Sequence, residues 1–130
     1  MKITIDTSAI IAVLFNEQHK AAIIAITQGG DLIAPHSLHW ELGNSLSAMF
    51  KRKRINIQQA ITALEIYSQI PIRFIESEIV EAVGIAFEKD IYAYDAYMLS
   101  IALKTNSPLL TLDSALKETA ITLGVELLEI

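Results

Sequence analysis

Four carboxylates stand out in this chain because each lies at the end of an apolar segment or beside small polar residues on a helical stretch. They are Asp6, Glu41, Asp95 and Asp113, called here the acidic quartet. Acids beside apolar elements are costly to bury unless a positive group meets them. Mg²⁺ and Mn²⁺ prefer oxygen ligands and accept few protein contacts. If the quartet converges, it predicts a divalent-cation site, and metal-assisted phosphodiester chemistry is the leading hypothesis.

Each member of the quartet also has an ordinary structural interpretation. Asp6 and Asp113 each follow an apolar run, at 3–5 and 109–112, and either one can cap the helix that comes next. Asp95 lies at the start of a nearly all-apolar helix, where the helix dipole favours an acid. Glu41 is the weakest alone, since a helical glutamate usually faces solvent. Only the joint pattern is specific for a metal site.

The elements that must position these acids alternate along the chain. Strands are predicted at 2–5, 31–34, 72–75, 109–112 and 125–128. Helices are predicted at 7–15, 17–28, 37–53, 57–69, 78–88, 94–104 and 114–123. Gly29-Gly30 ends the second helix, and Ser77 is expected to cap the helix at 78–88.

Strands joined through helices predict one α/β domain over residues 1–130, with a parallel sheet covered on both faces. In such folds ligands bind at the carboxyl ends of the strands, near the switch in strand order. Asp6 and Asp113 both occupy that edge by sequence. On the helix at 37–53, Glu41 is expected to share a face with four small or polar residues. These are Ser37, Asn44, Ser45 and Ala48.

The composition excludes several classes of protein. The 130 residues include no cysteine, so disulfides and thiolate metal sites are out. No apolar run approaches the roughly 20 residues that span a bilayer, and the opening strand pattern gives no sign of a signal peptide. A cytoplasmic location is therefore expected. The hydrophobic content of 52% and the mean hydropathy of +0.41 are high, which favours a partner or a second copy on an apolar surface.

The charge of the chain has two compatible interpretations. A net charge of −5, from 10 Lys and Arg against 15 Asp and Glu, is unlike a protein that holds nucleic acid by charge alone. Four of those ten cations are nevertheless consecutive: Lys51, Arg52, Lys53 and Arg54, called here the basic run. The run suits a solvated helix C-terminus, where cations favour the dipole. It also suits a patch that grips phosphates beside a metal-filled cleft.

Other residues carry weaker signals. His19, His36 and His39 have no triad-like companions, which argues against a Ser-His-Asp site. Gly29-Gly30 follows a helix rather than a strand, so a phosphate-binding loop is disfavoured. Four aromatic residues are expected in the core or an interface, although one near the site would stack on RNA. These are Trp40, Tyr92, Tyr94 and Tyr97.

With these residues in place, the whole chain resembles the PIN-domain nucleases, and among them the VapC-like toxins of bacterial and archaeal toxin–antitoxin pairs. The most specific segments are IDTSA at 5–9, YDAY at 94–97 and LTLD at 110–113. The segment WELGN at 40–44 fits the family's glutamate position. The acidic quartet matches the family's acids that bind Mg²⁺ or Mn²⁺. Some relatives have a further aspartate where Ser114 and Lys117 follow Asp113 here, which bears on the ligation of a second metal.

The resemblance also implies supporting residues and partners. Thr7 and Thr111 fall where the family often has hydroxyls that support the site, and Asn44 is expected to orient a carboxylate or a water. The family implies a three-layer α/β/α sandwich with a central mostly parallel sheet. It also implies homodimers, and an antitoxin whose tail fills the cleft.

The resulting hypothesis is a metal-dependent endoribonuclease that acts on RNA as the toxin of a toxin–antitoxin pair. Asp6, Asp95 and Asp113 would anchor one ion, and Glu41 would hold a second ion or the attacking water. One rival is a PIN nuclease outside any toxin pair, acting in RNA processing or on DNA. Another is a non-catalytic module whose acidic cleft receives a basic peptide.

Overall fold

The computed structural model describes all residues of the chain, 1–130, as four strands and seven helices. The strands are β1 (Lys2–Ile5), β2 (Asp31–Pro35), β3 (Ile72–Ile75) and β4 (Leu109–Leu110). The helices are α1 (Thr7–Leu14), α2 (Lys20–Thr27), α3 (Ser37–Lys51), α4 (Ile57–Tyr67), α5 (Ile79–Lys89), α6 (Ala93–Thr105) and α7 (Ser114–Thr122). The predicted helices and first four strands are all present, with ends that differ by a few residues.

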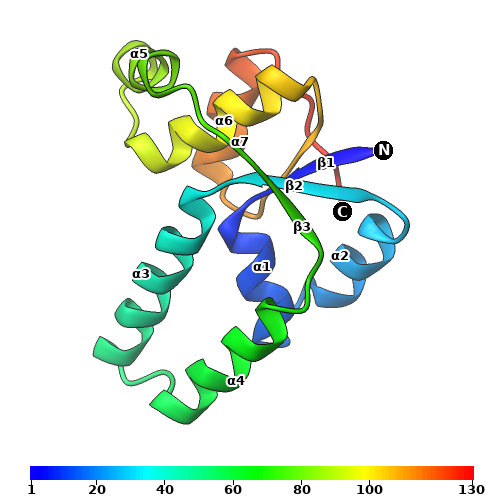
Figure 1. Ribbon diagram of the computed structural model, residues 1–130, viewed down its shortest axis with the longest axis vertical. Coiled ribbons are helices and arrows are strands. Elements are labelled where there is room, and N and C mark those ends of the chain that lie inside the picture. Colours follow the sequence, from blue (N-terminus) through cyan, green and yellow to red (C-terminus); the bar gives the residue numbers. More distant parts are fainter.

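The sheet has the order β3-β2-β1-β4, and every pair of neighbours is parallel. Helices α1 to α4 lie on one side of it and α5 to α7 on the other, which makes three layers (Figure 1). The predicted α/β/α sandwich is therefore confirmed. Because all strands run the same way, their carboxyl ends meet at one edge, and the chain enters α1, α3, α5 and α7 from that edge.

The core explains why the central elements carry so few polar residues. Ile3 and Ile5 of β1 are almost fully buried, because both faces of this strand are covered. Helix α6 contacts β1 and β2, and its residues from Met98 to Ala102 are all buried. A helix that is apolar nearly all round is a buried one. Asp95 therefore lies in the first turn of a helix whose middle is buried in the core.

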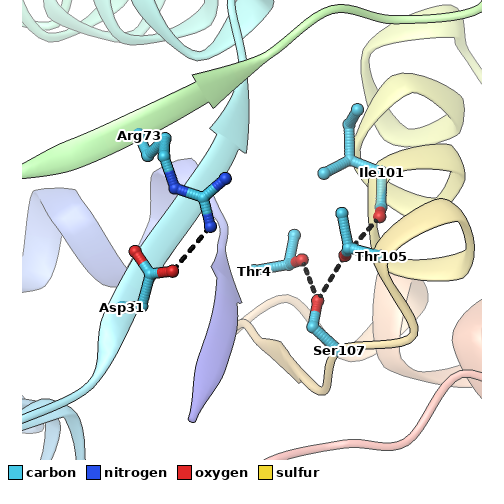
Figure 2. Close-up of polar contacts among 6 residues, drawn as sticks. All are labelled: Thr4, Asp31, Arg73, Ile101, Thr105 and Ser107. Atoms are coloured by element: carbon cyan, nitrogen blue, oxygen red, sulfur yellow. Dashed lines mark hydrogen bonds and ion pairs between the residues drawn. The ribbon is translucent and has the colours of Figure 1, made fainter.

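Small polar contacts tie the ends of these elements together (Figure 2). Ser107, after α6, shares hydrogen bonds with Thr4 of β1 at 2.6 Å and with Thr105 at 2.9 Å. Near the amino ends of the strands, Arg73 of β3 forms a 2.6 Å ion pair with Asp31 of β2. Exposed pairs of this kind contribute little to stability, because solvent screens them. Both groups of contacts support the fold rather than the edge where the acids lie.

The predicted strand at 125–128 is wrong. This segment makes a single parallel bridge between Leu109 and Leu127, with backbone hydrogen bonds from Leu109 to Glu126 and from Leu128 back to Leu109. The physical reason is the shortness of its neighbour. Strand β4 ends at Leu110, since the next residues turn into α7. A strand of two residues can pair with only a short stretch of its neighbour.

One other expectation is also corrected. Ser77 does not cap α5: the N-cap residue is Glu78, which makes no capping bond and instead pairs with Lys104 at 3.2 Å. Trp40 and Tyr92 were expected in the core or an interface; 62% and 88% of their surfaces are exposed, which excludes the core and leaves the interface as a prediction. None of the seven helices has both the length and the apolar character needed to cross a membrane.

Candidate active site

The acidic quartet lines a single cleft of about 330 Å³ at the carboxyl edge of the sheet, called here the acidic cleft. Its members come from four places: the end of β1, the middle of α3, the first turn of α6 and the residue before α7. The lining also includes Thr7, Ser8, Ile11, Asn44, Ser45 and Tyr94. The four acids therefore converge on one cleft, which their spacing in the sequence alone could not decide.

Asp6 is the most buried member, with 5% of its surface exposed. It is the N-cap of α1, and its Oδ2 atom accepts hydrogen bonds from the Ser8 hydroxyl at 2.8 Å and from the Thr111 hydroxyl at 2.7 Å. The Ser8 backbone N–H is also directed at Oδ2, at 3.5 Å. Its Oδ1 atom receives no hydrogen bond from the protein, which leaves one oxygen available to a ligand.

A set of hydroxyls fixes the distance between the first and last acids. Ser8 Oγ accepts the backbone N–H of Leu112 at 2.9 Å, and Thr111 Oγ1 accepts that of Asp113 at 3.1 Å. The two hydroxyl groups also contact each other at 3.2 Å. The end of β1 is thus joined to the turn after β4. The role of Ser8 was missed from the sequence, although a hydroxyl two residues after a strand-end acid was a usable signal.

Glu41 is half-buried, and the Thr7 hydroxyl donates a hydrogen bond to its Oε1 atom. Burial raises the pKa of this carboxyl to about 7. The bond from Thr7 opposes that rise, and the charges of the other three members of the quartet add to it. Glu41 is therefore ready to exchange a proton near neutral pH.

Asp95 is also half-buried, and no side chain or backbone group donates a hydrogen bond to its carboxylate. Burial, together with the charges of Asp6 and Asp113, raises its pKa to about 6. The protein has only two side-chain ion pairs, and neither involves a member of the quartet. The cleft therefore concentrates negative charge that no protein cation neutralises.

Asp113 caps α7, as one interpretation of its sequence predicted, and its role as a metal ligand stays a prediction. As the N-cap of α7 it accepts the backbone N–H groups of Ala115 at 2.9 Å and Leu116 at 3.3 Å. Both bonds use Oδ1, so Oδ2 is free of protein partners while the residue lines the acidic cleft. Capping and ligation are compatible because they use different oxygens.

Of the remaining predicted residues, some line the acidic cleft and others lie away from it. Asn44 and Ser45 share the face of α3 that carries Glu41 and line the acidic cleft, whereas Ser37 lines a neighbouring cleft. The basic run is fully exposed at the far end of α3 and makes no ion pair. Ten helical residues beyond Glu41 correspond to about 15 Å. The structure therefore does not bring the basic run into the acidic cleft.

The donor set fits a hard divalent cation with retained waters. No group of three or more acids already stands in metal-coordinating geometry, so the cleft is not a preformed all-protein cage. Mg²⁺ typically keeps several waters and uses only one or two carboxylates. Zinc fits poorly, since neither histidine nor cysteine lines the cleft. Four carboxylates without a protein cation would gain directly from such an ion.

Comparisons with known proteins agree with this fold. A family model described as the PIN domain matches residues 3–121. Among solved structures, PAE2754 from Pyrobaculum aerophilum superimposes with a TM-score of 0.71 at 21% identity, covering 92% of this chain and 79% of that one. The comparison with curated proteins gives no match.

Two structures of the Vap group are similarly close. VapBC2 from Rickettsia felis, bound to a DNA fragment from its promoter, gives a TM-score of 0.70 at 14% identity and 98% coverage of both chains. VapC20 from Mycobacterium tuberculosis, a Sarcin-Ricin loop cleaving toxin, gives 0.67 at 13% identity, covering 89% of this chain and 93% of that one. At these identities the likeness establishes the fold. Because the family model spans nearly the whole chain, the protein belongs to the PIN-domain family, whose activity is that of a nuclease.

Proposed function

We propose that the protein is a metal-dependent endoribonuclease and the toxin component of a toxin–antitoxin pair. The observation that carries this proposal is the convergence of four carboxylates, without any protein cation, on one cleft at the carboxyl edge of the sheet. Such a cleft repels a phosphate backbone unless a metal ion lies between them. The proposal therefore joins the metal and the nucleic acid in one site.

Asp6, Asp95 and Asp113 would hold the Mg²⁺ or Mn²⁺, and Glu41 would hold a second ion or the attacking water. When bound, the ion lowers the pKa of water and neutralises charge that builds on the phosphate oxygens. The free oxygens Oδ1 of Asp6 and Oδ2 of Asp113 suit the first role, because their partner oxygens are already fixed by hydrogen bonds.

Glu41 is suited to accept and release a proton. Its Oε1 atom is oriented by Thr7, and its Oε2 atom has no protein partner. In the metal-free protein this carboxyl has a pKa of about 7, and a bound ion would lower that pKa and favour the ionised form, which accepts a proton from water. Asn44 is available to orient the same water.

The partners proposed are an RNA substrate, a cognate antitoxin and a second copy of the chain, acting in the cytoplasm. The likeness to a loop-cleaving toxin supports RNA, and the likeness to VapBC2 supports a protein partner. Helix α5 supports a further contact, because Val80 and Phe87 are each 90% exposed and exposed apolar clusters mark interaction surfaces. The basic run would contact RNA phosphates outside the cleft.

The alternatives differ in what the cleft is for. A PIN nuclease that processes RNA or cuts DNA would keep the same metal chemistry with another substrate. A non-catalytic module would use the negative cleft to hold a basic peptide. Asp6→Asn separates catalysis from binding, since asparagine caps a helix as well as aspartate does and only the charge is removed.

The test is incubation of the purified chain with total cellular RNA, including transfer RNAs, in Mg²⁺ or Mn²⁺. Parallel lanes contain EDTA, the Asp6→Asn variant, or the control Asp90→Asn. Asp90 is an exposed acid in a left-handed conformation that asparagine also adopts readily. Discrete fragments from wild type and control alone support the proposal. Fragments that persist in EDTA or with Asp6→Asn contradict it, and cleavage of DNA alone favours the DNA alternative.

A further inference from the structure

A second cleft, of about 500 Å³, adjoins the acidic cleft and is called here the aromatic cleft. Its lining includes His36, Trp40, Glu76, Ile79, Tyr94 and Tyr97. Tyr94 lines both clefts, so the two are neighbours that share this side chain. Nothing in the proposed metal chemistry uses this second space.

The two helices that carry acids into the acidic cleft also carry aromatic rings into the aromatic cleft. Trp40 directly precedes Glu41 on α3, and Tyr94 directly precedes Asp95 on α6. Consecutive helical residues diverge by about 100°, so each pair serves two adjacent spaces. A ring placed this way lies one position along the chain from an acid of the metal site.

Both rings are exposed, and that of Trp40 lies against a packed histidine. Trp40 is 62% exposed and Tyr94 is 37% exposed, although large aromatic residues are usually well covered. The ring of Trp40 lies 5.7 Å from that of His39, which in turn packs at 4.3 Å on Phe74 and hydrogen-bonds Tyr67 at 2.9 Å. The first turn of α3 is therefore held in place, and Trp40 offers a prearranged surface.

The charges of the aromatic cleft identify the part of a nucleic acid that it suits. No lysine or arginine lines it, and the Glu76 carboxylate has no hydrogen bond or ion pair. A phosphate group is therefore disfavoured. An uncharged planar base stacks on aromatic side chains, and a carboxylate accepts a hydrogen bond from the amino group of a base.

We propose that the aromatic cleft binds an unpaired nucleobase adjacent to the phosphate held at the acidic cleft, with Trp40 and Tyr94 stacking on the base and Glu76 accepting its exocyclic amino group. The inference rests on the proposed function for the position of the phosphate. It adds that the substrate is single-stranded at this point and that adenine, cytosine or guanine is preferred over uracil, which lacks the amino group.

Trp40 is the only tryptophan of the chain, so its fluorescence reports directly on the aromatic cleft. Wild type in EDTA is titrated with tetraadenylate, tetrauridylate and an abasic ribose-phosphate tetramer of the same length. The phosphates of all three meet the same repulsion from the metal-free acidic cleft, so differences in affinity report on the base. Tetraadenylate is expected to quench the fluorescence and to bind about tenfold more tightly than the abasic tetramer, as one stacked base provides. Tetrauridylate is expected to lie between the two.

Paired variants assign the contacts. Tyr94→Leu should reduce the affinity for tetraadenylate about tenfold. Tyr92→Leu is the matched control, because Tyr92 is an exposed tyrosine two residues earlier that lines neither cleft, and it should bind as wild type does. Glu76→Ala should abolish the preference for tetraadenylate over tetrauridylate. The abasic comparison needs no substitution, so it remains decisive if a variant fails to fold.

Several results would overturn the inference. The first is equal binding of tetraadenylate and the abasic tetramer, and the second is an equal loss of affinity in Tyr94→Leu and Tyr92→Leu. The others are quenching of the Trp40 fluorescence by the amide of Gly-Arg-Gly but not by the tetranucleotides, or quenching that follows only an increase in protein concentration. The last two would assign the cleft to a protein partner or to a second copy. The titration contains no metal, so it is independent of cleavage. Base-dependent quenching without cleavage in Mn²⁺ would remove the nuclease proposal and keep this one, and cleavage without base-dependent quenching would do the reverse.

Discussion

The Thr111 hydroxyl donates a 2.7 Å hydrogen bond to Oδ2 of Asp6, across a sequence separation of 105 residues. The same oxygen of Thr111 accepts the backbone N–H of Asp113 at 3.1 Å. One buried hydroxyl therefore sets both ends of the acidic quartet. It satisfies part of the Asp6 carboxylate without bringing in a positive charge, which leaves the attraction for a cation intact.

Thr111→Val tests this arrangement. The variant keeps the shape of the side chain but leaves a buried carboxylate oxygen short of a donor, so the free energy of unfolding should fall by about 1–3 kcal/mol. Affinity for Mn²⁺ should fall as well, because Asp6 and Asp113 lose their fixed separation. Urea unfolding and calorimetric titration with Mn²⁺ measure the two effects.

The matched control is Thr4→Val. Thr4 is equally buried on β1 and hydrogen-bonds Ser107, away from the acidic cleft. It should cost stability without changing Mn²⁺ affinity. Equal losses of Mn²⁺ affinity in both variants would show that Thr111 matters only for folding.

In the metal-free protein, the contribution of Glu41 and Asp95 to stability should fall as the pH rises from about 4 to about 7. The pKa of Glu41 is raised from 4.5 to about 7 and that of Asp95 from 3.8 to about 6, so the folded state binds more protons than the unfolded state within this window. The contribution of these groups to the free energy of unfolding therefore falls with rising pH and levels off above pH 7. Urea unfolding in EDTA at pH 5 and pH 8 measures it.

Glu41→Gln isolates one of the two groups, since glutamine still accepts the Thr7 hydrogen bond. Relative to wild type, this variant should gain stability between pH 5 and pH 8, on the order of 1 kcal/mol after allowance for solvent screening around a half-buried group. Glu65→Gln, on the exposed face of α4, is the matched substitution outside the cleft. If the stability of both variants relative to wild type changes with pH in the same way, the pH effect cannot be assigned to Glu41.

A divalent ion should reverse this pH effect. Binding requires ionised carboxylates, so Mn²⁺ should raise the Tm more at pH 8 than at pH 5.5. At one hundred times its Kd the ion contributes about 2.7 kcal/mol, which is several degrees for a domain of this size. The pH midpoint of RNA cleavage should move downward as the Mn²⁺ concentration rises, because the ion competes with protons at Glu41 and Asp95. A midpoint independent of Mn²⁺ concentration would count against ligation by these residues.

The basic run should affect RNA binding without affecting the metal. Arg52→Glu/Arg54→Glu should weaken the binding of single-stranded RNA and reduce the slope of log K against log salt by about 0.7 for each phosphate that the run no longer neutralises. Fluorescence anisotropy at several salt concentrations measures this slope. Lys2→Glu/Lys20→Glu makes the same charge change elsewhere, with Lys2 at the amino end of β1. Equal slopes in both double variants would show that the basic run acts only through net charge.

Local pattern was enough for the order of the seven helices and the first four strands, and for placing two of the four acids at one edge of the sheet. Period-two and helical patterns identify β1 and α6 without tertiary information, since side-chain direction alternates in one and follows 3.6 residues per turn in the other. Asp6 and Asp113 were predictable as neighbours because parallel strands bring their carboxyl ends to one edge. Glu41 and Asp95 were singled out by their places on helical stretches, and the segments at 40–44 and 94–97 then matched them to the acids of the family.

Only the tertiary structure decided the direction, burial and pKa values of those acids. The direction of Glu41 depends on how α3 packs, and its pKa of about 7 depends on burial and on three charges from distant parts of the chain. The exposure of Trp40 and the absence of a fifth strand at 125–128 likewise follow from what lies beside them, a neighbouring cleft and a two-residue β4. The sequence by itself determined which groups reach the edge of the sheet, because backbone geometry is local. Packing decided the acidic cleft, its charge and the neighbouring aromatic cleft, because desolvation and Coulomb energies depend on distances that residue order does not specify.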